Sequence, residues 1–491
     1  AFFRNDSPTW WGKPVVVKRR DEVAGAVRHL DVKNVRDTYV PVIHQLNKKR
    51  YLVGVKLING DAKQAWEEHR ATLDEFAKPG KAQQKKRQTK GEKPGRGLWG
   101  NATRSELTKE QREQIEALEA IGYIDGEMLA EGVLPVISDH DATRAQQGLN
   151  FYTSGHAPEA TLMTMNGQVL HRWKARFRDV FGQAINTKRD HKGAQYWRRA
   201  WPLENGDVIA IFEGLAIIRI DKDSQVVWAV QNNAHHDAAF LPDSSLIVLT
   251  RTAHLVPEVN PDIPALEDFV VWMDENGEET RRLSLLKALL ESEHRSIFDR
   301  VQRKWKKAGD LFHTNAIEIL DGSLEHRDPA FKAGNLLLSS RAMSALYIVD
   351  PEAEKVVWSA RGEFRTQHDP HVTFDGTILL FDNTGRNGKS QLLEIDPISH
   401  DPTWRWPKQR QNPFFSGICG TVARLDNGNT LATESRGGRA VELAPNGEAV
   451  WNFQSPHRAG DNDAYIAMLF EMIRLPPDFP FRGDDEESGT E

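Results

Sequence analysis

From about residue 150 onward, short apolar segments alternate with polar turns, and one pattern recurs. Each copy is an apolar segment that ends near an Asp or Asn turn, followed by a second segment that often ends in Trp. Apolar runs of this length between turn residues predict β-strands. Six copies align, the third without a closing Trp: Leu162–Gly167 with Trp173, Ile217–Asp221 with Trp228, Val270–Asp274, Leu346–Asp350 with Trp358, Leu392–Asp396 with Trp404 or Trp406, and Val441–Ala444 with Trp451.

A hairpin pattern precedes every copy except the first. Two apolar segments flank an Asn/Asp-Gly type of turn, which joins antiparallel strands. Together the two patterns make a four-stranded meander, and the closest copies are about 46 residues apart, as expected for one propeller blade per repeat. Six meanders predict an all-β fold, a six-bladed β-propeller over residues 148–480. The turns are Leu203–Gly206, Leu241–Ser244, Leu320–Gly322, Phe374–Gly376 and Leu425–Gly428.

The two ends of the repeat region complement each other. The first copy lacks a leading strand, because only Phe151–Thr153 precedes it. The segment Met472–Pro476 aligns with Ala238–Pro242, a leading strand elsewhere in the repeat. We therefore expect this C-terminal strand to close the ring, which removes an exposed sheet edge.

Residues 1–147 do not show the repeat, and their pattern of apolar and polar positions predicts a mixed α/β extension before the propeller. Val15–Val17 and Tyr51–Val55 are typical of short strands, and Ala62–Phe76 and 108–122 of helices. The segment 78–98 is polar, with eight basic residues and one acidic residue between Lys78 and Arg96. Such a run is either a solvated linker or an arm that binds an acidic protein partner.

Two further segments interrupt or follow the repeats. A charged helical insertion is expected at 283–310, with four leucines on one side, either packed on the propeller flank or serving as a lid over the channel. The residues 481–491 form an acidic tail.

The composition excludes some classes of binding partner but does not identify the cellular compartment. The net charge of −6 is small for 491 residues and gives no signal for nucleic-acid binding. No run of about 20 apolar residues exists, so no transmembrane segment is predicted. The single Cys419 forms no internal disulfide and leaves the compartment open. The chain begins with Ala1 rather than Met, which is consistent with a removed signal or anchor segment, or with an arbitrary boundary.

Histidines recur at one point of the repeat, just before each leading strand. Because leading strands lie nearest the axis, these positions are expected to meet at one mouth of the central channel. The aligned triplets are Trp197–Arg199, His235–Asp237, His313–Asn315, Gln367–Asp369 and Cys419–Thr421. In a hairpin the second strand returns to the start of the first, which adds Arg251, Arg341, Asp382–Asn383 and Glu434–Ser435 to this mouth.

The predicted cluster suits a reaction on an anionic group. Arginines donate forked hydrogen bonds to sulfate, phosphate or carboxylate oxygens. A free imidazole can act as a nucleophile, and a neighbouring His or carboxylate can hold or accept a proton of the reacting group. A metal site is the competing interpretation, since His371 and His368 flank a proline and a turn there would bring them together. Against it, the chain has no closely spaced HxH or HExxH pair. The alternative interpretation is that the histidines and aspartates only cap strands and hydrogen-bond neighbouring blades.

The motifs Ala234–Asp237, Phe312–Asn315, Ser339–Arg341 and Thr366–His368, with the six-copy Trp pattern, resemble the bacterial arylsulfate sulfotransferase family over roughly residues 148–480. The resemblance implies a six-bladed propeller that moves a sulfuryl group from a phenolic sulfate ester to a phenol through a sulfohistidine. It implies no nucleotide donor and no cofactor or metal. It also implies a periplasmic or otherwise exported protein, with a cytoplasmic location still open.

Carried over by motif, the resemblance assigns roles to individual residues. His368 is expected to be the nucleophile, while Arg341, His313 and Asn315 hold the sulfate oxygens. His236 is expected to assist the phenolic oxygen, with His235 as the alternative in this doublet. Arg198 and His371 complete the expected substrate-binding set.

Two other classes of function stay open on the sequence alone. One is a non-catalytic propeller that acts as a binding or scaffold subunit, held to a partner through the basic arm. The other is a metal- or quinone-dependent oxidoreductase, for which the chain shows no cofactor-specific motif.

Overall fold

The computed structural model describes three N-terminal strands and residues 136–182, 192–298, 309–385, 388–407, 414–459 and 465–481. The chain divides into two compact units, Ala1–Trp99 and Gly100–Glu491. The predicted helices at 62–76 and 108–122, the basic arm and nearly all of the acidic tail lie outside the described residues. No helix in the described part of the chain is long and apolar enough to cross a membrane.

The first unit contains a three-stranded antiparallel sheet. The order is β1 (Trp10–Val17), β3 (Arg50–Leu57), β2 (Tyr39–Asn47), so the strand that is last in sequence lies in the middle. The two predicted strands of this region fall inside β1 and β3. The central strand β2 was not predicted as a separate element.

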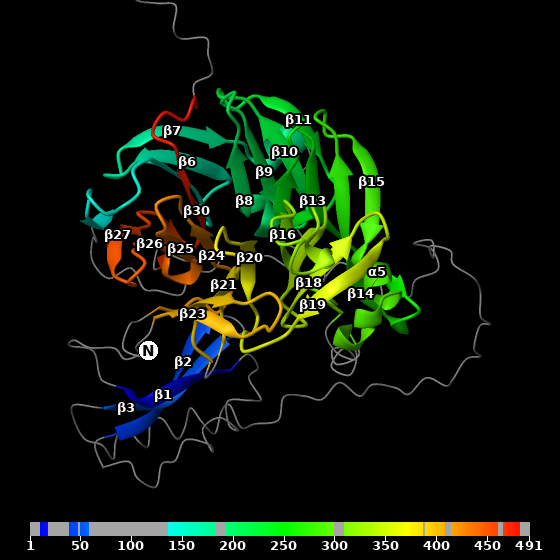
Figure 1. Cartoon of the computed structure of the whole chain (residues 1–491). Coiled ribbons are helices and arrows are strands. Elements are labelled where there is room, and N and C mark those ends of the chain that lie inside the picture. The colour runs from blue at the N-terminus through cyan, green and yellow to red at the C-terminus, as the bar shows by residue number, and fades with distance from the viewer. Residues whose placement is uncertain are drawn as a thin grey trace, which may run out of the picture. The chain divides into compact units, whose positions relative to one another are not determined.

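The second unit is a six-bladed β-propeller, as predicted (Figure 1). Blades 2 to 5 each contain four consecutive antiparallel strands. They are β8 (Arg199–Pro202), β9 (Val208–Phe212), β10 (Ala216–Ile220) and β11 (Val226–Val230); β12 (Ala234–Phe240), β13 (Leu246–Val256), β14 (Asn260–Met273) and β15 (Glu279–Ser284); β16 (Thr314–Ile319), β17 (Leu336–Ser340), β18 (Ala345–Asp350) and β19 (Lys355–Ala360); and β20 (His368–Val372), β21 (Ile378–Asp382), β22 (Gln391–Ile395) and β23 (Pro402–Trp406).

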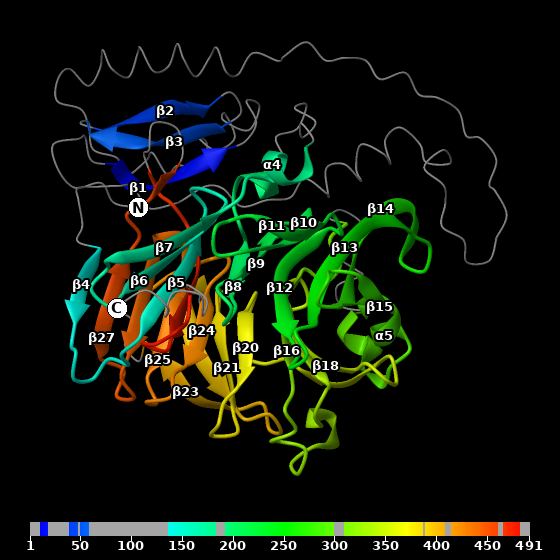
Figure 2. The ribbon, with the colours of Figure 1, turned by 90° about the horizontal axis from the view of Figure 1, so that it is seen from above.

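Blades 1 and 6 join the two ends of the chain. Blade 1 has the order β30 (Leu469–Leu475), β5 (Leu149–Ser154), β6 (Glu159–Thr164), β7 (Val169–Lys174), so the C-terminal strand closes the ring as predicted (Figure 2). Blade 6 contains β24 (Thr421–Arg424), β25 (Thr430–Glu434), β26 (Arg439–Leu443) and β27 (Ala449–Gln454). Its outer edge is extended by β4 (Ile137–His140), a strand that precedes the predicted start of the propeller and that the sequence did not predict.

The core consists of separate apolar clusters, one between each pair of neighbouring blades. Strand β21 shows how one strand serves two of them. Its residues alternate, so that Ile378 and Leu380 pack between blades 4 and 5, while Leu379 and Phe381 pack between blades 5 and 6. Successive side chains of a strand point to opposite faces. A strand buried on both faces therefore needs a continuous apolar run, and this explains why the repeats do not alternate with polar residues.

In five of the six blades, a recurring Trp forms a hydrogen bond with the next blade. The indole N–H donates to a turn carbonyl of the following blade: Trp173 to Gly206 at 2.9 Å, Trp228 to Glu275 at 3.0 Å, Trp358 to Pro397 at 3.2 Å, Trp406 to Gly447 at 2.9 Å and Trp451 to Met165 at 2.9 Å. The fifth closing residue is thus Trp406 rather than Trp404. Blade 3 has Arg281 at this position, and its guanidinium donates to the Pro351 carbonyl and pairs with Glu352.

The charged insertion begins with a short helix, α5 (Leu285–Leu290), that follows β15 directly. Ser284 caps this helix by accepting a hydrogen bond from the Lys287 N–H. Leu285, Leu286 and Leu289 are buried in the cluster between blades 3 and 4. This part of the insertion therefore packs on the propeller flank, and residues 299–308 lie outside the described residues.

Candidate functional site

Leading strands surround the axis and begin irregularly at one mouth. β12 contacts β16, β16 contacts β20, and β20 contacts β24. The strand pairing shifts register at the start of β12, β16 and β20. Several residues there have a positive φ, including His236 at 56° and His313 at 48°. Non-glycine residues seldom adopt this conformation, and those that do gather at functional sites.

Three of the predicted histidines lie together at this mouth. The Nδ1 atoms of His235 and His236 are 2.9 Å apart, and the ring centroids of His236 and His313 are 5.0 Å apart. Burial lowers the pKa of both His235 and His236 well below the usual range, and the charge of nearby Arg251 or His313 adds to this effect. These two imidazoles are therefore neutral at neutral pH.

Each of these histidines has a carboxylate beside it. Asp268 Oδ1 is 3.8 Å from His235 Nε2, and Glu213 Oε1 is 3.4 Å from His236 Nδ1. Asp310 makes the closest pair, 2.6 Å from Nδ1 of His313. A carboxylate at Nδ1 holds an imidazole in one orientation and stabilises its protonated form. Burial, together with the charge of Asp310, raises the pKa of Asp268 to about 7.

His368, the first residue of β20, has its tautomer determined by its neighbours. Its Nδ1 lies 2.6 Å from Asn383 Oδ1 and 3.1 Å from the Thr366 carbonyl oxygen. Asn383 Nδ2 donates to the carbonyls of Ser416 and Cys419, so Oδ1 is the atom that faces His368. Both neighbours of Nδ1 are acceptors, and Nδ1 must carry the proton. The lone pair of His368 is therefore on Nε2.

The charge around His368 keeps its ring neutral. Burial lowers the pKa of His368 well below the usual range, although the hydrogen bond with Asn383 opposes the shift. The positive charges of Arg198 and Arg341 also lower the pKa of His368. A neutral imidazole with an available lone pair is a competent nucleophile.

The arginines of the mouth differ in their surroundings. The Arg198 Nε is 4.0 Å from Glu213, and its guanidinium lies over the Phe470 ring. Arg251 Nη2 is 3.3 Å from Glu213 and lies so close to Gly214 that a Cβ there would be 2.2 Å away. Arg341 follows β17, and its Nε is buried without a hydrogen-bond partner among the described residues. That donor is suited to an anionic ligand.

A second polar group lies on the axis and joins four blades. Arg199 pairs with Asp237 at 2.5 Å, with Asp369 at 2.6 Å and with Glu471 at 2.6 Å. Two of these carboxylates also accept from leading strands, Asp237 from the Ile317 N–H and Asp369 from the Val422 N–H. The aspartates of the histidine triplets therefore serve to hold the ring together.

Two predicted substrate-binding residues lie with structural partners. His371 Nε2 is 3.1 Å from Asp369, which places His371 with the axial group rather than with His368. Asn315 Nδ2 donates to the Gln367 carbonyl at 2.8 Å and so links blades 4 and 5. The role predicted for Asn315 at the sulfate oxygens and the substrate-binding role predicted for His371 remain predictions.

The sequence model of one family, described as Arylsulfotransferase (ASST), matches residues 199–456, just over half of the chain. The chain belongs to the arylsulfotransferase family. His235, His236, His313, Arg341 and His368 all lie inside the matched segment, and Arg198 directly precedes it. The family resemblance seen in the motifs is confirmed.

The chain is also distantly similar to several solved structures. Among curated proteins no sequence matches this arylsulfotransferase family member. Solved structures similar to it include a Bacteroides caccae protein of unknown function, at 11% identity, TM-score 0.42, 67% of this chain and 99% of that one. A Staphylococcus aureus virginiamycin B lyase is 10% identical, with TM-score 0.32, 52% of this chain and 69% of that one. The Cps50 (Swd1) propeller of Myceliophteria thermophila is 12% identical, with TM-score 0.39, 68% of this chain and 99% of that one.

Three carboxylates at this mouth were not predicted. Glu213 directly follows β9, the second strand of blade 2, in the same place as Arg341 after β17. Extending the hairpin argument to blade 2 would have found it. Asp268 lies within the long third strand β14, and Asp310 lies at the end of the charged insertion. Neither position belongs to the repeat pattern, so no periodic signal marks them.

One group of potential metal ligands lies at this mouth. In the described parts of the chain, two groups of three side chains have ligand atoms within 4.8 Å of one another. One group is Glu213, His235 and His236, and neither group contains the pair His368 and His371. The metal pair proposed from the proline turn is therefore not supported, because His371 is directed to Asp369 instead.

Proposed function

We propose that this protein transfers a sulfuryl group from a phenolic sulfate ester to a phenol, through a sulfohistidine at His368. The observation that carries the proposal is the tautomer of His368. Its Nδ1–H is held by Asn383 and Thr366, which leaves Nε2 as the nucleophilic atom. Membership of the arylsulfotransferase family supports the choice of substrate class.

In the first half-reaction, Nε2 of His368 attacks the sulfur of the donor ester. A nitrogen–sulfur bond forms, the bond from sulfur to the aryl oxygen breaks, and a phenolate leaves. In the second half-reaction the acceptor phenol attacks sulfur, loses its proton to a base, and His368 is regenerated. The sulfuryl oxygens would be held by Arg198 and Arg341, whose charges both act on His368.

The leaving phenolate takes up a proton, and the acceptor phenol gives one up. The geometry favours His313 for this exchange, because Asp310 at 2.6 Å stabilises its protonated ring. His236, the candidate favoured by the sequence, lies beside it with a ring-centroid distance of 5.0 Å and a more distant carboxylate. His236 and His235 are neutral, and we assign them to positioning the phenolic oxygen.

The proposal is tested by mixing the purified protein with p-nitrophenyl sulfate and a simple phenol and following p-nitrophenolate by absorbance. We expect release that depends on the phenol and that His368→Ala abolishes. The matched control is His326→Ala, an exposed histidine whose Nδ1 contacts the Ser323 carbonyl. Turnover by a folded His368→Ala protein equal to that of the wild type would contradict the proposal.

Other expectations remain proposals beside this one. The natural donor and acceptor are phenolic compounds of unassigned structure, and export from the cytoplasm is expected from the resemblance alone. The scaffold alternative depends on the basic segment 78–98, which lies outside the described residues. Co-purification of a partner that is lost on deleting 78–98 would support that alternative.

A further inference from the structure

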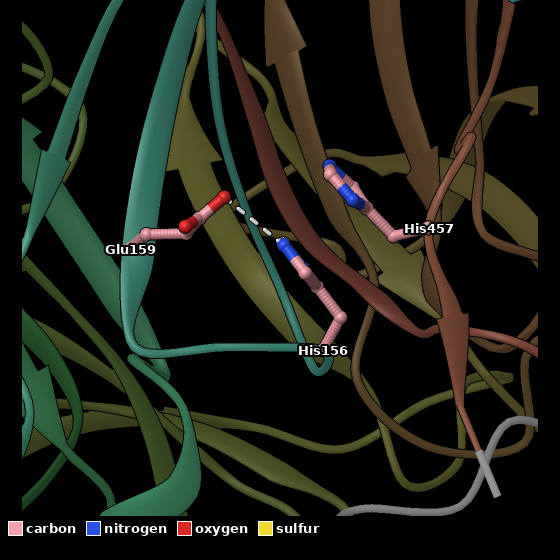
Figure 3. A group of neighbouring side chains, drawn as sticks. All are labelled: His156, Glu159 and His457. Carbon is pink, nitrogen blue, oxygen red and sulfur yellow. Dashed lines mark hydrogen bonds and ion pairs between the residues drawn. The ribbon is translucent and has the colours of Figure 1, made fainter.

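A second histidine cluster lies on the same face of the propeller as the site, where the ring closes. His156 lies in the turn between β5 and β6 of blade 1, Glu159 is the first residue of β6, and His457 follows β27 of blade 6 (Figure 3). The end of β5 pairs with the start of the closing strand β30. The cluster therefore joins the first blade to the segment that leads into the strand that completes the ring.

The three side chains offer a set of ligand atoms typical of a transition-metal site. One atom from each of His156, Glu159 and His457 lies within 4.8 Å of the others. His156 Nε2 is 3.0 Å from Glu159 Oε1. Two imidazoles and one carboxylate are a donor set that zinc accepts, with a further position for water. Oxygen-preferring ions such as Mg²⁺ are disfavoured by the two nitrogen ligands.

Outer partners orient both imidazoles. Ser154 Oγ is 2.5 Å from His156 Nδ1, so Nε2 of His156 is directed toward Glu159. Tyr152 OH is 3.1 Å from His457 Nε2, which leaves Nδ1 of His457 for an ion. Histidine ligands of metal ions ordinarily have their second nitrogen held by such a hydrogen bond. An ordinary surface His–Glu pair does not need two such partners.

The geometry requires one small movement. The His156 and His457 rings are stacked, with centroids 3.5 Å apart and an interplanar angle of 9°. The lone pairs of parallel rings do not converge, so one ring must turn about its side-chain bonds to let both reach one ion. In a tetrahedral site with bonds of 2.0–2.1 Å the ligand atoms are about 3.4 Å apart. The three atoms here lie within 4.8 Å of one another, so no pair needs to close by more than about 1.4 Å.

Solvent reaches the cluster. The side chains of His156 and Glu159 are each 18% exposed. Glu159 also lines a cavity of about 670 Å³ between blades 1 and 2, together with Lys174 and Arg176. An ion can therefore enter without opening the core, and water can occupy the remaining coordination position.

We propose that His156, Glu159 and His457 bind one zinc ion, or a similar divalent transition-metal ion. This ion would hold blade 1 to the segment that leads into the closing strand of the propeller. The site is separate from the sulfuryl-transfer proposal, because it is measured by metal content and not by turnover. Binding links blade 1 to the chain that enters the closing strand, and it therefore stabilises the closed ring against unfolding.

The test is metal binding by the full chain. Protein stripped with a chelator is dialysed against Zn²⁺, passed over a desalting column and analysed for zinc; Co²⁺ serves in parallel as a probe with visible absorbance. We expect one ion per chain, with affinity reduced at least roughly 100-fold in His457→Asn and in Glu159→Gln, since even changes to outer partners weaken metal sites 10- to 100-fold. Zinc should raise the thermal unfolding midpoint of the wild type and not of these variants.

The matched control is His254→Asn. His254 also pairs with a glutamate, with 2.6 Å between its Nε2 and Glu267 Oε2, but it is not part of either three-residue group. This variant should bind zinc as the wild type does. Wild-type protein that binds no zinc would overturn the proposal. So would zinc that persists in the folded His457→Asn and Glu159→Gln variants, and loss of that zinc in His235→Asn would then locate it at Glu213, His235 and His236.

Discussion

A single amide determines which nitrogen of His368 is available for reaction. Asn383 Nδ2 donates hydrogen bonds to two backbone carbonyls, and this orients Oδ1 toward the His368 ring. Neither the strand pattern nor the motif shows this, because the argument depends on which atoms donate. The sequence placed Asn383 at the mouth by hairpin geometry, and the role of its amide becomes visible only from the hydrogen bonds.

Replacing Asn383 by Leu should therefore lower kcat more than it raises KM. Without Asn383 Oδ1, His368 loses the shorter of its two Nδ1 hydrogen bonds and keeps only the one to the Thr366 carbonyl, so the tautomer with a free Nε2 is selected less strongly. Loss of an analogous orienting carboxylate lowers kcat by up to ~10⁴ in serine proteases. For a neutral amide we expect a decrease on the order of 100-fold in kcat, measured with p-nitrophenyl sulfate. The control Thr384→Ala removes the neighbouring hydroxyl; equal kcat in the two variants would refute the positioning role.

The acid–base assignment gives a second prediction at this scale. Changing Asp310 to Asn keeps the shape beside His313 but removes the charge that stabilises its protonated ring. Donors with a poor leaving group need that proton most, whereas p-nitrophenolate leaves readily without it. We expect Asp310→Asn to slow transfer from phenyl sulfate by roughly 10²-fold or more, and to slow transfer from p-nitrophenyl sulfate much less. An equal decrease in the rate of transfer from both donors would contradict the assignment of His313 as the general acid.

Among the elements, the strand that ends each blade also binds that blade to the next. The apolar runs and turn residues were sufficient to predict the strands, and the Trp repeat marked the ends of five of the six blades. The hydrogen-bond donor at blade 3 is Arg281, which no Trp-based pattern could identify. Strand β4 was missed because it has four residues, no apolar run and no buried side chain. Its place is determined by its partner β27.

The two tryptophans of β23 test this joint directly. Trp406 is buried and donates to the Gly447 carbonyl, while Trp404 is only partly buried and no such bond is described for it. Trp406→Phe removes the donor to the partly buried Gly447 carbonyl and leaves a small cavity. We expect a loss of about 2 kcal/mol in the free energy of unfolding. Trp404→Phe should lose less than about 1 kcal/mol. The free energy of unfolding of both variants is measured by chemical denaturation. A larger loss in Trp404→Phe than in Trp406→Phe would contradict the assignment of Trp406 as the residue that joins blades 5 and 6.

The charged groups along the axis also affect the stability of the whole molecule, and His371, whose side chain is 39% exposed, is one of them. Burial lowers the pKa of His371, but the charges of Asp369 and Glu318 outweigh this effect and raise it to about 9. A histidine with a raised pKa adds stability that is complete below its unfolded pKa of about 6.5 and lost as the pH rises to 9. We therefore expect the thermal unfolding midpoint to decrease as the pH is raised from 6.5 to 9. His371→Gln should flatten this slope, and an unchanged slope would show that other groups cause it.

Ring closure supplies the last and most demanding test of the architecture. Arg474 of the closing strand lies 2.8 Å from Glu442 of blade 6, and both side chains are fully buried. Removing one partner leaves an uncompensated buried charge, which costs about 3–5 kcal/mol. Arg474→Met should therefore destabilise the protein by about this amount, measured by denaturant unfolding. Glu442 also accepts from the Gln146 N–H and from Asn429, so Glu442→Gln keeps one acceptor while removing the charge. If closure depends on this pair, the double variant Arg474→Met/Glu442→Gln will be more stable than Arg474→Met alone, whereas additive losses would mean that the two residues act independently.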